Sequence, residues 1–445
     1  MPEGTIYLEF ADEASDEEKQ QIIDKYALQL VESERDGALT VRPTTAAEDA
    51  VGISAKMQNE TAISCAEPDL ATEGHLKSLD LPADELLDRQ WHLRNSGEHG
   101  GQSIGYKAGA DARVVEAWQL LGNLGSADVV IGVIDDGFDI SHPDLMGKTV
   151  YPWDFTRHSN DVRPAPHLFD GRLGDWHGSA CAGVATARAA GGQVVGAAPE
   201  AKLIPVRWGP SLEPRGVAKW FDHMTEKGAW IVSCSWGAAA AVFPLHRRIS
   251  RAIERCARDG RSGKGTLILF AAGNDNRDIN NLPDSLDGFA IHPDVMAIAA
   301  STSRDEKADY SNFGNEISIC APSSGRGGWG ITTSDAQGTY IDAHGVRRPM
   351  GYAPGDYTFS FGGTSSACPL AAGIAALVLG ANPDLTAAEV RSILETTARK
   401  IGDENGYDAN GHSRVFGYGC VDAAAAVKRA QELRMQAAEA IVEQV

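Results

Sequence analysis

Apolar runs of strand length alternate with helical stretches throughout the chain after Arg89, and this alternation limits the fold most strongly. The expected strands are 129–134, 202–207, 230–235, 266–271, 295–300 and 317–321, and the expected helices are 112–121, 178–187, 217–227, 245–259 and 373–380. Strands and helices in alternation form a parallel sheet covered on both faces. We therefore predict an α/β fold with a doubly wound, mostly parallel sheet and ligand groups at the carboxyl ends of its strands. The Gly-rich segment 322–360 is expected to form surface loops beside the site.

A small α+β unit precedes this region. Residues 5–10, 28–34, 38–43 and 61–66 have strand patterns, and residues 15–26 and 46–58 have helical ones. The order βαββαβ predicts a ferredoxin-like domain. Residues 74–89 are polar and lack periodicity, as a linker does. The predicted organisation is therefore a small domain over 1–73, a linker over 74–89 and a large domain over 90–445 that ends in a helix.

A turn of small residues leads into an apolar run between Ser360 and Leu379. It reads Ser-Phe-Gly-Gly-Thr-Ser-Ser-Ala-Cys-Pro from Ser360 to Pro369. N–H groups at a helix N-terminus point outward and favour negative charge, so a hydroxyl at this place is suited to nucleophilic chemistry. Ser365 is the candidate nucleophile. Taken alone, Gly-Thr-Ser before an apolar helix is equally typical of an ordinary helix cap.

Two further clusters supply groups that activate a serine. Asp135 follows the apolar run 129–134, and His177 begins a stretch of small residues. A neutral hydroxyl needs a base in contact to attack a peptide bond, and histidine has a pKa near neutrality. An aspartate would fix the tautomer of the imidazole and stabilise its cation. Asp135, His177 and Ser365 occur in the chain order of subtilisin, which differs from the orders in chymotrypsin and in the α/β-hydrolases.

With these residues and further motifs in family order, the chain resembles the subtilisin-like serine proteases (subtilases, peptidase S8 type). The further motifs include Gln90-Trp91-His92-Leu93, His142-Pro143-Asp144-Leu145, Ser233-Cys234-Ser235-Trp236-Gly237, Ala271-Ala272-Gly273-Asn274 and Asp309-Tyr310-Ser311-Asn312-Phe313-Gly314. The resemblance extends from about residue 88 to residue 428. It implies a serine endopeptidase that hydrolyses peptide bonds through an acyl-enzyme on Ser365.

The resemblance also implies roles for groups around the nucleophile. The side-chain amide of Asn274 and the backbone N–H of Ser365 would bind the oxyanion of the tetrahedral intermediate. Ser235-Trp236-Gly237 and Ala271-Ala272-Gly273 resemble the two walls of the primary specificity pocket. The first of these segments would also pair with the substrate backbone.

The residue accepted at P1, whose carbonyl is attacked, stays open. Asp136 and Cys181 resemble the kexin/furin branch, in which the second aspartate helps to bind a basic residue. Ala238 to Ala241, however, stand where that branch carries acids. A small or apolar P1 residue is therefore as compatible with the sequence as a basic one, with possible acidic subsites at Asp175, Asp284 and Asp287.

The N-terminal domain resembles the inhibitory propeptide of subtilases, which implies a self-inhibited zymogen that processes itself. The bonds Lys77-Ser78, Leu79-Asp80 and Leu81-Pro82 lie in the segment where cleavage would occur, and the segment has no dibasic pair. An accessory or partner-binding domain is the alternative. For the whole chain, the alternative is a non-catalytic or permanently self-inhibited protein that serves recognition or regulation.

No cofactor is required for this chemistry, and calcium is expected only as a structural ion. Asp144 matches a calcium ligand of the family, and Gln90 resembles another. The loop 188–192 lacks the expected asparagine. Since calcium prefers several oxygen ligands, the sequence is compatible with a site that is degraded or absent.

Net charge and cysteine content limit the kinds of partner, metal site and cellular compartment that fit this chain. A formal charge of -21 at pH 7 disfavours nucleic acid and anionic membranes as partners and favours the approach of basic peptides. A peptide or protein substrate is the partner that the family resemblance implies. The seven scattered cysteines contain no Cys-x-x-Cys spacing, which argues against zinc and suits a reducing compartment. The N-terminus lacks the features of a signal peptide. We therefore expect a cytoplasmic protein, with secretion as the alternative.

Overall fold

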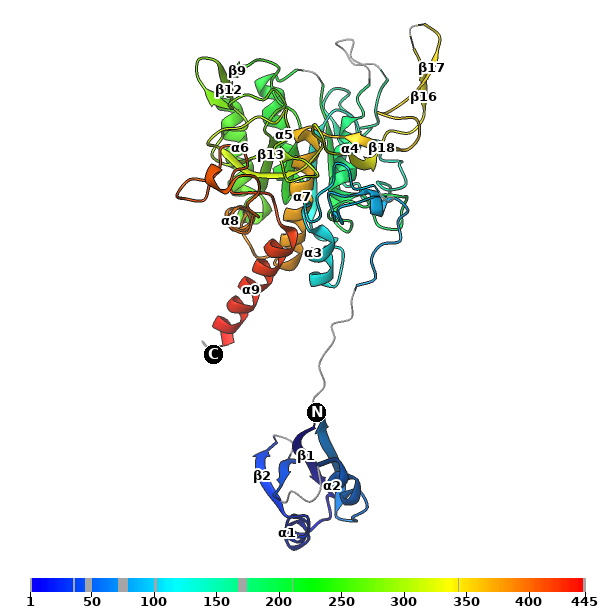
Figure 1. Cartoon of the computed structure of the whole chain (residues 1–445), viewed down its shortest axis with the longest axis vertical. Coiled ribbons are helices and arrows are strands. Elements are labelled where there is room, and N and C mark those ends of the chain that lie inside the picture. Colours follow the sequence, from blue (N-terminus) through cyan, green and yellow to red (C-terminus); the bar gives the residue numbers. More distant parts are fainter. Residues whose placement is uncertain are drawn as a thin grey trace. The chain divides into compact units, whose positions relative to one another are not determined.

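The computed structural model describes residues 2–34, 37–44, 50–70, 79–99, 102–166, 174–209, 211–342 and 344–442. The chain divides into two compact units, Met1–Lys77 and Ser78–Val445 (Figure 1). The second part of the predicted linker, from residue 79, lies in the second unit, where Leu86 N–H donates to the carbonyl of Gln193 (2.8 Å) and a short 3-10 turn, η1, covers Leu87–Arg89. Residues 71–78, which include part of the expected cleavage segment, lie outside the described residues.

The N-terminal unit is a four-stranded antiparallel sheet with two helices. Its elements are β1 (Pro2–Phe10), α1 (Asp16–Lys25), β2 (Leu28–Ser33), β3 (Leu39–Pro43), α2 (Ala50–Met57) and β4 (Ile63–Leu70), in the predicted order. The strands lie in the order β2-β3-β1-β4. Ser15 and Glu18 cap α1 reciprocally, since each side chain accepts the backbone N–H of the other residue. Ile6, Leu8 and Met57 belong to a core that contains residues of this unit alone.

A seven-stranded parallel sheet forms the centre of the second unit. Its strand order is β14-β13-β10-β8-β5-β7-β6, and all of its pairings are parallel. The strands are β5 (Val130–Asp135), β6 (Trp153–Asp154), β7 (Lys202–Arg207), β8 (Ile231–Cys234), β10 (Leu267–Ala271), β13 (Val295–Ser301) and β14 (Ile317–Pro322). The predicted α/β fold is confirmed. Only β6 was missed, because two residues are too few to show a period.

Helices cover both faces of this sheet. One face packs against α3 (Val114–Leu121), α4 (His177–Thr186), α7 (Thr364–Ala381), α8 (Ala387–Thr396) and α9 (Ala423–Val442), and the other against α5 (Pro214–Glu226) and α6 (Arg247–Asp259). Successive strand residues point to opposite faces. Val133 accordingly lies in the first core, and its neighbour Ile134 lies in the second.

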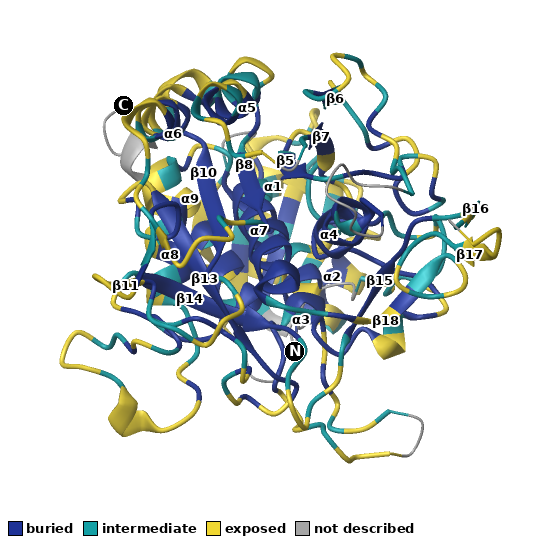
Figure 2. Cartoon of the chain, turned by 90° about the horizontal axis from the view of Figure 1, so that it is seen from above, coloured by how far each residue is buried: buried dark blue, intermediate teal, exposed yellow. Residues whose placement is uncertain are grey.

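Helix α7 is the central helix of the unit and is buried along its length (Figure 2). It is long and apolar enough to cross a membrane, but 89% of this stretch is buried inside the protein, which identifies it as a core helix. It begins at Thr364, nine residues before the predicted start at Gly373. Ser365 therefore lies in the first turn of the helix.

The segment 322–360 contains more regular structure than predicted. β15 (Ile331–Ser334) pairs with β18 (Tyr357–Phe361), and β16 (Thr339–Ile341) pairs with β17 (Arg347–Pro349) in a hairpin that projects from the unit (Figure 1). The expectation of surface loops is wrong for β15, whose residues are all buried. A third small sheet joins β11 (Asn280–Asn281), β12 (Ser285–Asp287) and β9 (Val242–Phe243). Short 3-10 turns cover Arg261–Gly263 (η2) and Glu404–Gly406 (η3).

Candidate active site

The predicted site residues meet at the carboxyl edge of the central sheet. Asp135 ends β5 and is in register with Arg207 at the end of β7. Ile134 is in register with Cys234, so Ser235 follows β8 at the same level. His177 begins α4, and Ser365 lies at the start of α7. Strand ends and helix starts therefore converge, as the topology of an open α/β sheet requires.

Asp135 and His177 form a hydrogen-bonded pair. Oδ1 of the buried Asp135 lies 2.8 Å from Nδ1 of His177. Burial alone would lower the pKa of His177, but the negative charge of Asp135 and this hydrogen bond raise it well above 6.5. Oδ2 of Asp135 is buried and accepts no hydrogen bond from the described residues. An imidazole held through Nδ1 has Nε2 available as a base.

The backbone of Ser365 is fixed by groups outside its helix. Pro369 has no N–H, so the carbonyl of Ser365 lacks its usual partner four residues later in α7. This carbonyl accepts from Ser235 Oγ (3.0 Å) and Cys181 Sγ (3.5 Å) instead. Cys181 Sγ also lies 3.7 Å from His177 Nδ1, so one side chain contacts both predicted catalytic residues. Burial raises the pKa of Cys181 to about 12, which keeps the thiol neutral.

The hydroxyl of Ser365 donates to the carbonyl of Ser235 over 3.4 Å. Among the described residues, no hydrogen bond joins Ser365 Oγ to His177 Nε2. A 3.4 Å contact is weak, and catalytic hydrogen bonds are often long or misaligned before a substrate binds. This weak contact therefore does not hold the hydroxyl firmly in one orientation.

The side-chain amide of Asn274 is oriented by the residue before Ser365. Asn274 Oδ1 accepts from the N–H (2.8 Å) and from the hydroxyl (3.0 Å) of Thr364. This network assigns Nδ2 to the other side of the amide, next to Gly363, where a Cβ would lie only 3.1 Å from Nδ2. Asn274 Nδ2 therefore lies beside the N-terminus of α7 and donates no hydrogen bond to the residues that the structure describes.

A cavity of about 130 Å³ opens beside Ser365 and Asn274. Of the predicted substrate-binding residues it is lined by Ser235, Trp236, Gly237, Ala271 and Gly273, whereas Ala272 and Asp136 do not line it. Asn312 also lines this cavity, but it was not predicted as a site residue, although the motif 309–314 that contains it is typical of the family. Asn312 donates to the carbonyl of Ala272 (2.9 Å) and accepts from Asp275 N–H (3.0 Å), so it shapes the wall that follows β10.

Asp136 holds the start of α4. Its Oδ1 accepts the backbone N–H groups of Gly178 (2.9 Å) and Gly137 (2.6 Å), which satisfies an amide at the helix N-terminus. Burial and the neighbouring Asp135 raise the pKa of Asp136 to about 7, against the opposing effect of His177. A part for Asp136 in substrate binding stays a prediction.

A second buried charged network lies next to the Asp135–His177 pair. Arg207 Nη1 lies 2.8 Å from Asp154 Oδ2, and Arg207 Nε lies 3.0 Å from Asp175 Oδ2. The side chain of Arg207 is 4% exposed, and those of both aspartates are fully buried. Asp175 was considered as an acidic subsite, but its carboxylate is engaged by Arg207 and by the N–H of Ala165. It is therefore not available to a substrate, and the exposed Asp284 does not line the cavity either.

Asp144 is the strongest candidate for holding a cation. It is fully buried, and neither carboxylate oxygen accepts a hydrogen bond from the described residues. Burial raises its pKa to about 7, although the hydroxyl of Tyr357 lies close enough to oppose this. A Cβ on Gly192 would clash with Asp144 Oδ1, so only glycine lets this loop approach the carboxylate. Gln90, the other proposed ligand, is instead paired with the backbone of Val195 (2.7 and 2.9 Å).

Donor atoms of Asp135, His177 and Cys181 also lie within 4.8 Å of one another. A metal ion bound there would occupy His177 Nδ1, which already forms the hydrogen bond to Asp135. We therefore attribute this cluster of donor atoms to the Asp135–His177 pair and not to a metal site.

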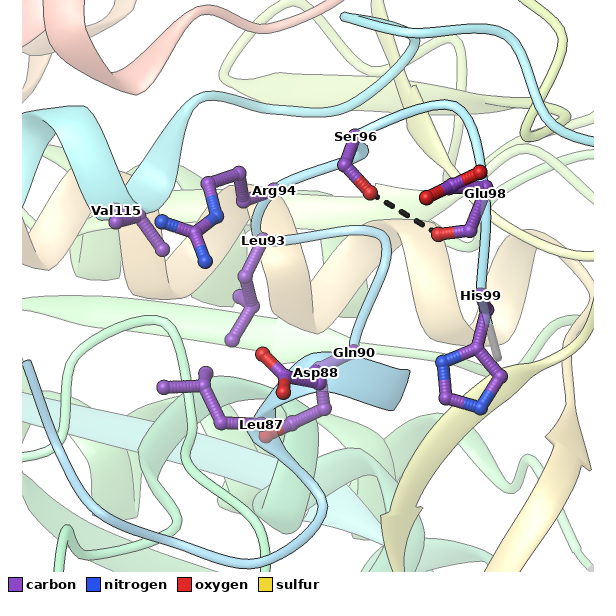
Figure 3. A pocket seen from close by; sticks show the side chains of 9 residues that line it. All are labelled: Leu87, Asp88, Gln90, Leu93, Arg94, Ser96, Glu98, His99 and Val115. Carbon is purple, nitrogen blue, oxygen red and sulfur yellow. Dashed lines mark hydrogen bonds between the residues drawn. The ribbon is translucent and has the colours of Figure 1, made fainter. Parts of the chain in front are cut away.

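A larger cavity, of about 440 Å³, shares no lining residue with the cavity beside Ser365 (Figure 3). It is lined by Leu87, Asp88, Gln90, Leu93, Arg94, Ser96, Glu98, His99 and Val115.

Residues 126–419 match the model of the subtilase family, Peptidase_S8. The chain belongs to the subtilase family. This subtilase is 35% identical to a calcium-dependent protease of Trichormus variabilis over 92% of this chain and 61% of the relative, and 34% identical to one of Nostoc sp. over 96% and 63%. The chain thus spans about three fifths of the length of these relatives. In fold it is similar to a serine protease of Aeromonas sobria, with a TM-score of 0.65, 22% identity and coverage of 81% of this chain and 68% of that one.

Proposed function

We propose that this subtilase is a serine endopeptidase whose triad is Asp135, His177 and Ser365. The observation that carries the proposal is the 2.8 Å hydrogen bond between Asp135 and His177, next to a cavity lined by Ser365 and Asn274. Membership of the subtilase family supports the same reaction.

The residues divide the reaction between them. Ser365 Oγ attacks the carbonyl carbon of the substrate, and His177 Nε2 takes its proton. Asn274 Nδ2 and the N–H of Ser365 bind the resulting oxyanion. His177 then gives the proton to the leaving amine as the C–N bond breaks. Water, activated by the same imidazole, hydrolyses the acyl-enzyme.

Hydrolysis of a fluorogenic peptide library by the wild type and by Ser365→Ala tests this assignment. Labelling of the wild type by a fluorophosphonate reagent, with Ser365 identified by peptide mass, counts the active sites. Turnover and labelling that both disappear in Ser365→Ala support the proposal. Turnover that persists in the variant contradicts it.

We further propose that the N-terminal unit acts as an intramolecular inhibitor that the enzyme removes. The unit has its own core, and its strand β2 exposes the apolar side chains of Leu30 (54%) and Val31 (49%), as expected of a surface that docks. Intact-mass spectra of incubated wild type should show a piece ending near residues 73–89, while Ser365→Ala stays whole. Cleavage of both proteins alike would indicate a contaminating protease.

Calcium is proposed as a structural ion at Asp144. A buried carboxylate fits a cation when neither of its oxygens accepts a hydrogen bond from the described residues, although His142 Nδ1 lies 3.6 Å from Asp144 Oδ2. Both oxygens of the nearby Asp84 are fixed by the N–H of Ala190 (3.0 Å). Calcium would neutralise these buried acids and stabilise the loop after α4. The names of the two bacterial relatives agree with this proposal.

A further inference from the structure

Two buried cysteines lie side by side at one edge of the central sheet. Cys320 is in β14, the outermost strand at that edge, and it forms a parallel bridge with Cys420 in the segment that leads into α9. Two backbone hydrogen bonds fix this bridge, because Cys320 N–H donates to the carbonyl of Gly419 (2.9 Å) and Val421 N–H donates to the carbonyl of Cys320 (2.9 Å). Two cysteines about 100 positions apart in the chain are therefore held opposite each other.

Both thiols belong to the same small core cluster. Cys320 and Cys420 are 0% exposed and share this cluster with Ile401 and Phe416. Burial and the adjoining thiol of Cys420 raise the pKa of Cys320, so this side chain is a neutral thiol in the reduced protein. Ser301 Oγ lies 3.8 Å from Cys420 Sγ, which is a weak polar contact.

The backbone separation at this bridge suits a disulfide. Neighbouring strands lie about 4.8 Å apart, and the Cα atoms of disulfide-bonded cysteines are usually about 4.4–6.8 Å apart. Bridge partners lie directly across from each other, and both of these side chains enter the same core. An S–S bond can therefore form here with the path of the backbone preserved.

Another pair of neighbouring thiols differs from this one. Cys368 of α7 donates to the carbonyl of Cys234 in β8 (3.7 Å), and its Sγ lies 3.4 Å from Ser233 Oγ. The thiol of Cys368 thus contacts oxygen atoms, and no strand pairing aligns a helix residue with a strand residue. Of the two pairs, only Cys320 and Cys420 are held in register by backbone hydrogen bonds.

We propose that Cys320 and Cys420 form a reversible disulfide that clasps the part of the chain between them. That part contains α8 and α7 with Ser365, but the clasp does not depend on the reaction at Ser365. A cross-link between residues about 100 positions apart restricts the unfolded chain strongly, so the oxidised protein should be more stable than the reduced one. The thiols would persist in a reducing compartment, and the disulfide would form in an oxidising one.

A small disulfide such as oxidised glutathione is a sufficient oxidant. One cysteine loses its proton and attacks oxidised glutathione, so that a mixed disulfide forms and one glutathione leaves. The second cysteine loses its proton and attacks the mixed disulfide, the protein S–S bond forms and the second glutathione leaves. The protein thiols thus lose two protons and two electrons, which reduce one glutathione disulfide to two thiols. Because both cysteines are buried, the exchange requires local opening around Cys420 and should be slow.

Oxidation of the full chain in a glutathione buffer tests the proposal. The Ser365→Ala protein is used so that self-cleavage does not interfere, and free thiols are blocked with N-ethylmaleimide before unreduced digestion with trypsin. We expect the tryptic peptides 308–326 and 415–428, each of which contains one cysteine, to be recovered as one linked species. Its mass should be that of the two peptides minus two hydrogens, and dithiothreitol should separate them.

The thermal stability of the same samples shows what the link does. Oxidation should raise Tm by several degrees, and Cys320→Ala and Cys420→Ala should each abolish both the linked species and this rise. Cys256→Ala is the matched control, because Cys256 is equally buried but hydrogen-bonds to the hydroxyls of Thr225 and Thr266. It should keep the linked species and the rise in Tm.

Three results would overturn the proposal. The first is a folded protein that, after prolonged oxidation, contains only unlinked peptides or glutathione adducts. The second is a link from Cys320 or Cys420 to another cysteine, or a link that forms only in denaturant. The third is a linked species with a lower Tm than the reduced protein. The link is measured in a chain that keeps all its cysteines, so the result stands even where an alanine variant fails to fold.

Discussion

Two buried charged networks lie side by side at the edge of the central sheet, and they differ in how completely their atoms are paired. In the first, Arg207 engages both Asp154 and Asp175, and all three side chains are almost fully buried. In the second, Asp135 holds His177 through one oxygen only. The other oxygen accepts no hydrogen bond from the described residues, and the side chain of His177 is 26% exposed.

This difference separates a structural network from one suited to chemistry. A fully paired buried network fixes its elements and has nothing left to offer a substrate. In an incompletely paired network, a free acceptor oxygen can still stabilise a positive charge that forms during a reaction, such as that of an imidazolium. Asp144, whose oxygens accept no hydrogen bond from the described residues, extends the comparison to a site suited to a cation. In these two carboxylates, the buried oxygens without hydrogen-bond partners therefore indicate where the protein is suited to chemistry or to binding a cation.

Removal of the nucleophile should have the largest effect. Ser365→Ala is expected to lower kcat by about 10⁶-fold, the size of effect known for the catalytic serine of subtilisin. Ser366→Ala is a matched control, because Ser366 Oγ is buried against Ser323 Oγ (2.7 Å) in the same turn. It should keep activity within about tenfold. Equal losses in the two variants would assign the effect to folding.

Neutralising Asp135, the incompletely paired acid, should have the second largest effect on activity. Asp135→Asn is expected to lower kcat by about 10⁴-fold, because the imidazole loses the partner that fixes its tautomer. The pH profile provides a sharper readout. Asp135 raises the pKa of His177, so wild-type kcat/KM should rise with pH through a midpoint above 6.5 as the base loses its proton. The midpoint should move to lower pH in the variant, and an unchanged midpoint would contradict the assignment.

Replacing Arg207, the centre of the fully paired network, should affect the stability of the protein more than its activity. Arg207→Met leaves the buried Asp175 without its cation and leaves Asp154 with only the partly exposed Arg157, 3.5 Å away. We expect a loss of about 3–5 kcal/mol in the free energy of unfolding. Arg207→Lys should recover part of this loss, since it restores the charge but not the bidentate geometry. Denaturant unfolding measures both variants. A pH midpoint of activity that shifted as in Asp135→Asn would show that the two networks are not separate.

Calcium should have the smallest effect. At a calcium concentration about 100 times the dissociation constant, binding would stabilise the protein by about 2.7 kcal/mol, or by several degrees in Tm. A chelator should reverse this shift in the wild type, while Asp144→Asn should show no calcium-dependent shift. Asp139→Asn is the control, because Asp139 lies nearby in sequence but its carboxylate is already hydrogen-bonded by Ser141 and Gln337.

The sequence predicts local features of the site better than its long-range pairings. Short motifs single out Asp135, His177, Asn274 and Ser365, because each lies directly at or after a strand or at a helix start. Asp175, Asp284 and Asp287 were all considered as acidic subsites, but only Asp287 lines the cavity, and its position depends on pairing between β12 and β9, which are over 40 residues apart in the chain. Arg207 is likewise predicted only as a strand residue, since its partners come from distant segments. The β15–β18 pairing was missed because its polar residues do not look buried.

The position of α7 also governs when the enzyme can work during its synthesis. This helix follows all seven strands of the central sheet in the chain and packs between them and α9, which is made later still. A ribosome-bound chain that ends before α7 already contains the acid and the base but has neither nucleophile nor finished core. With the proposed triad, a growing chain therefore cannot cleave its neighbours before α7 has been synthesised, because the nucleophile is the last of the three residues to be made.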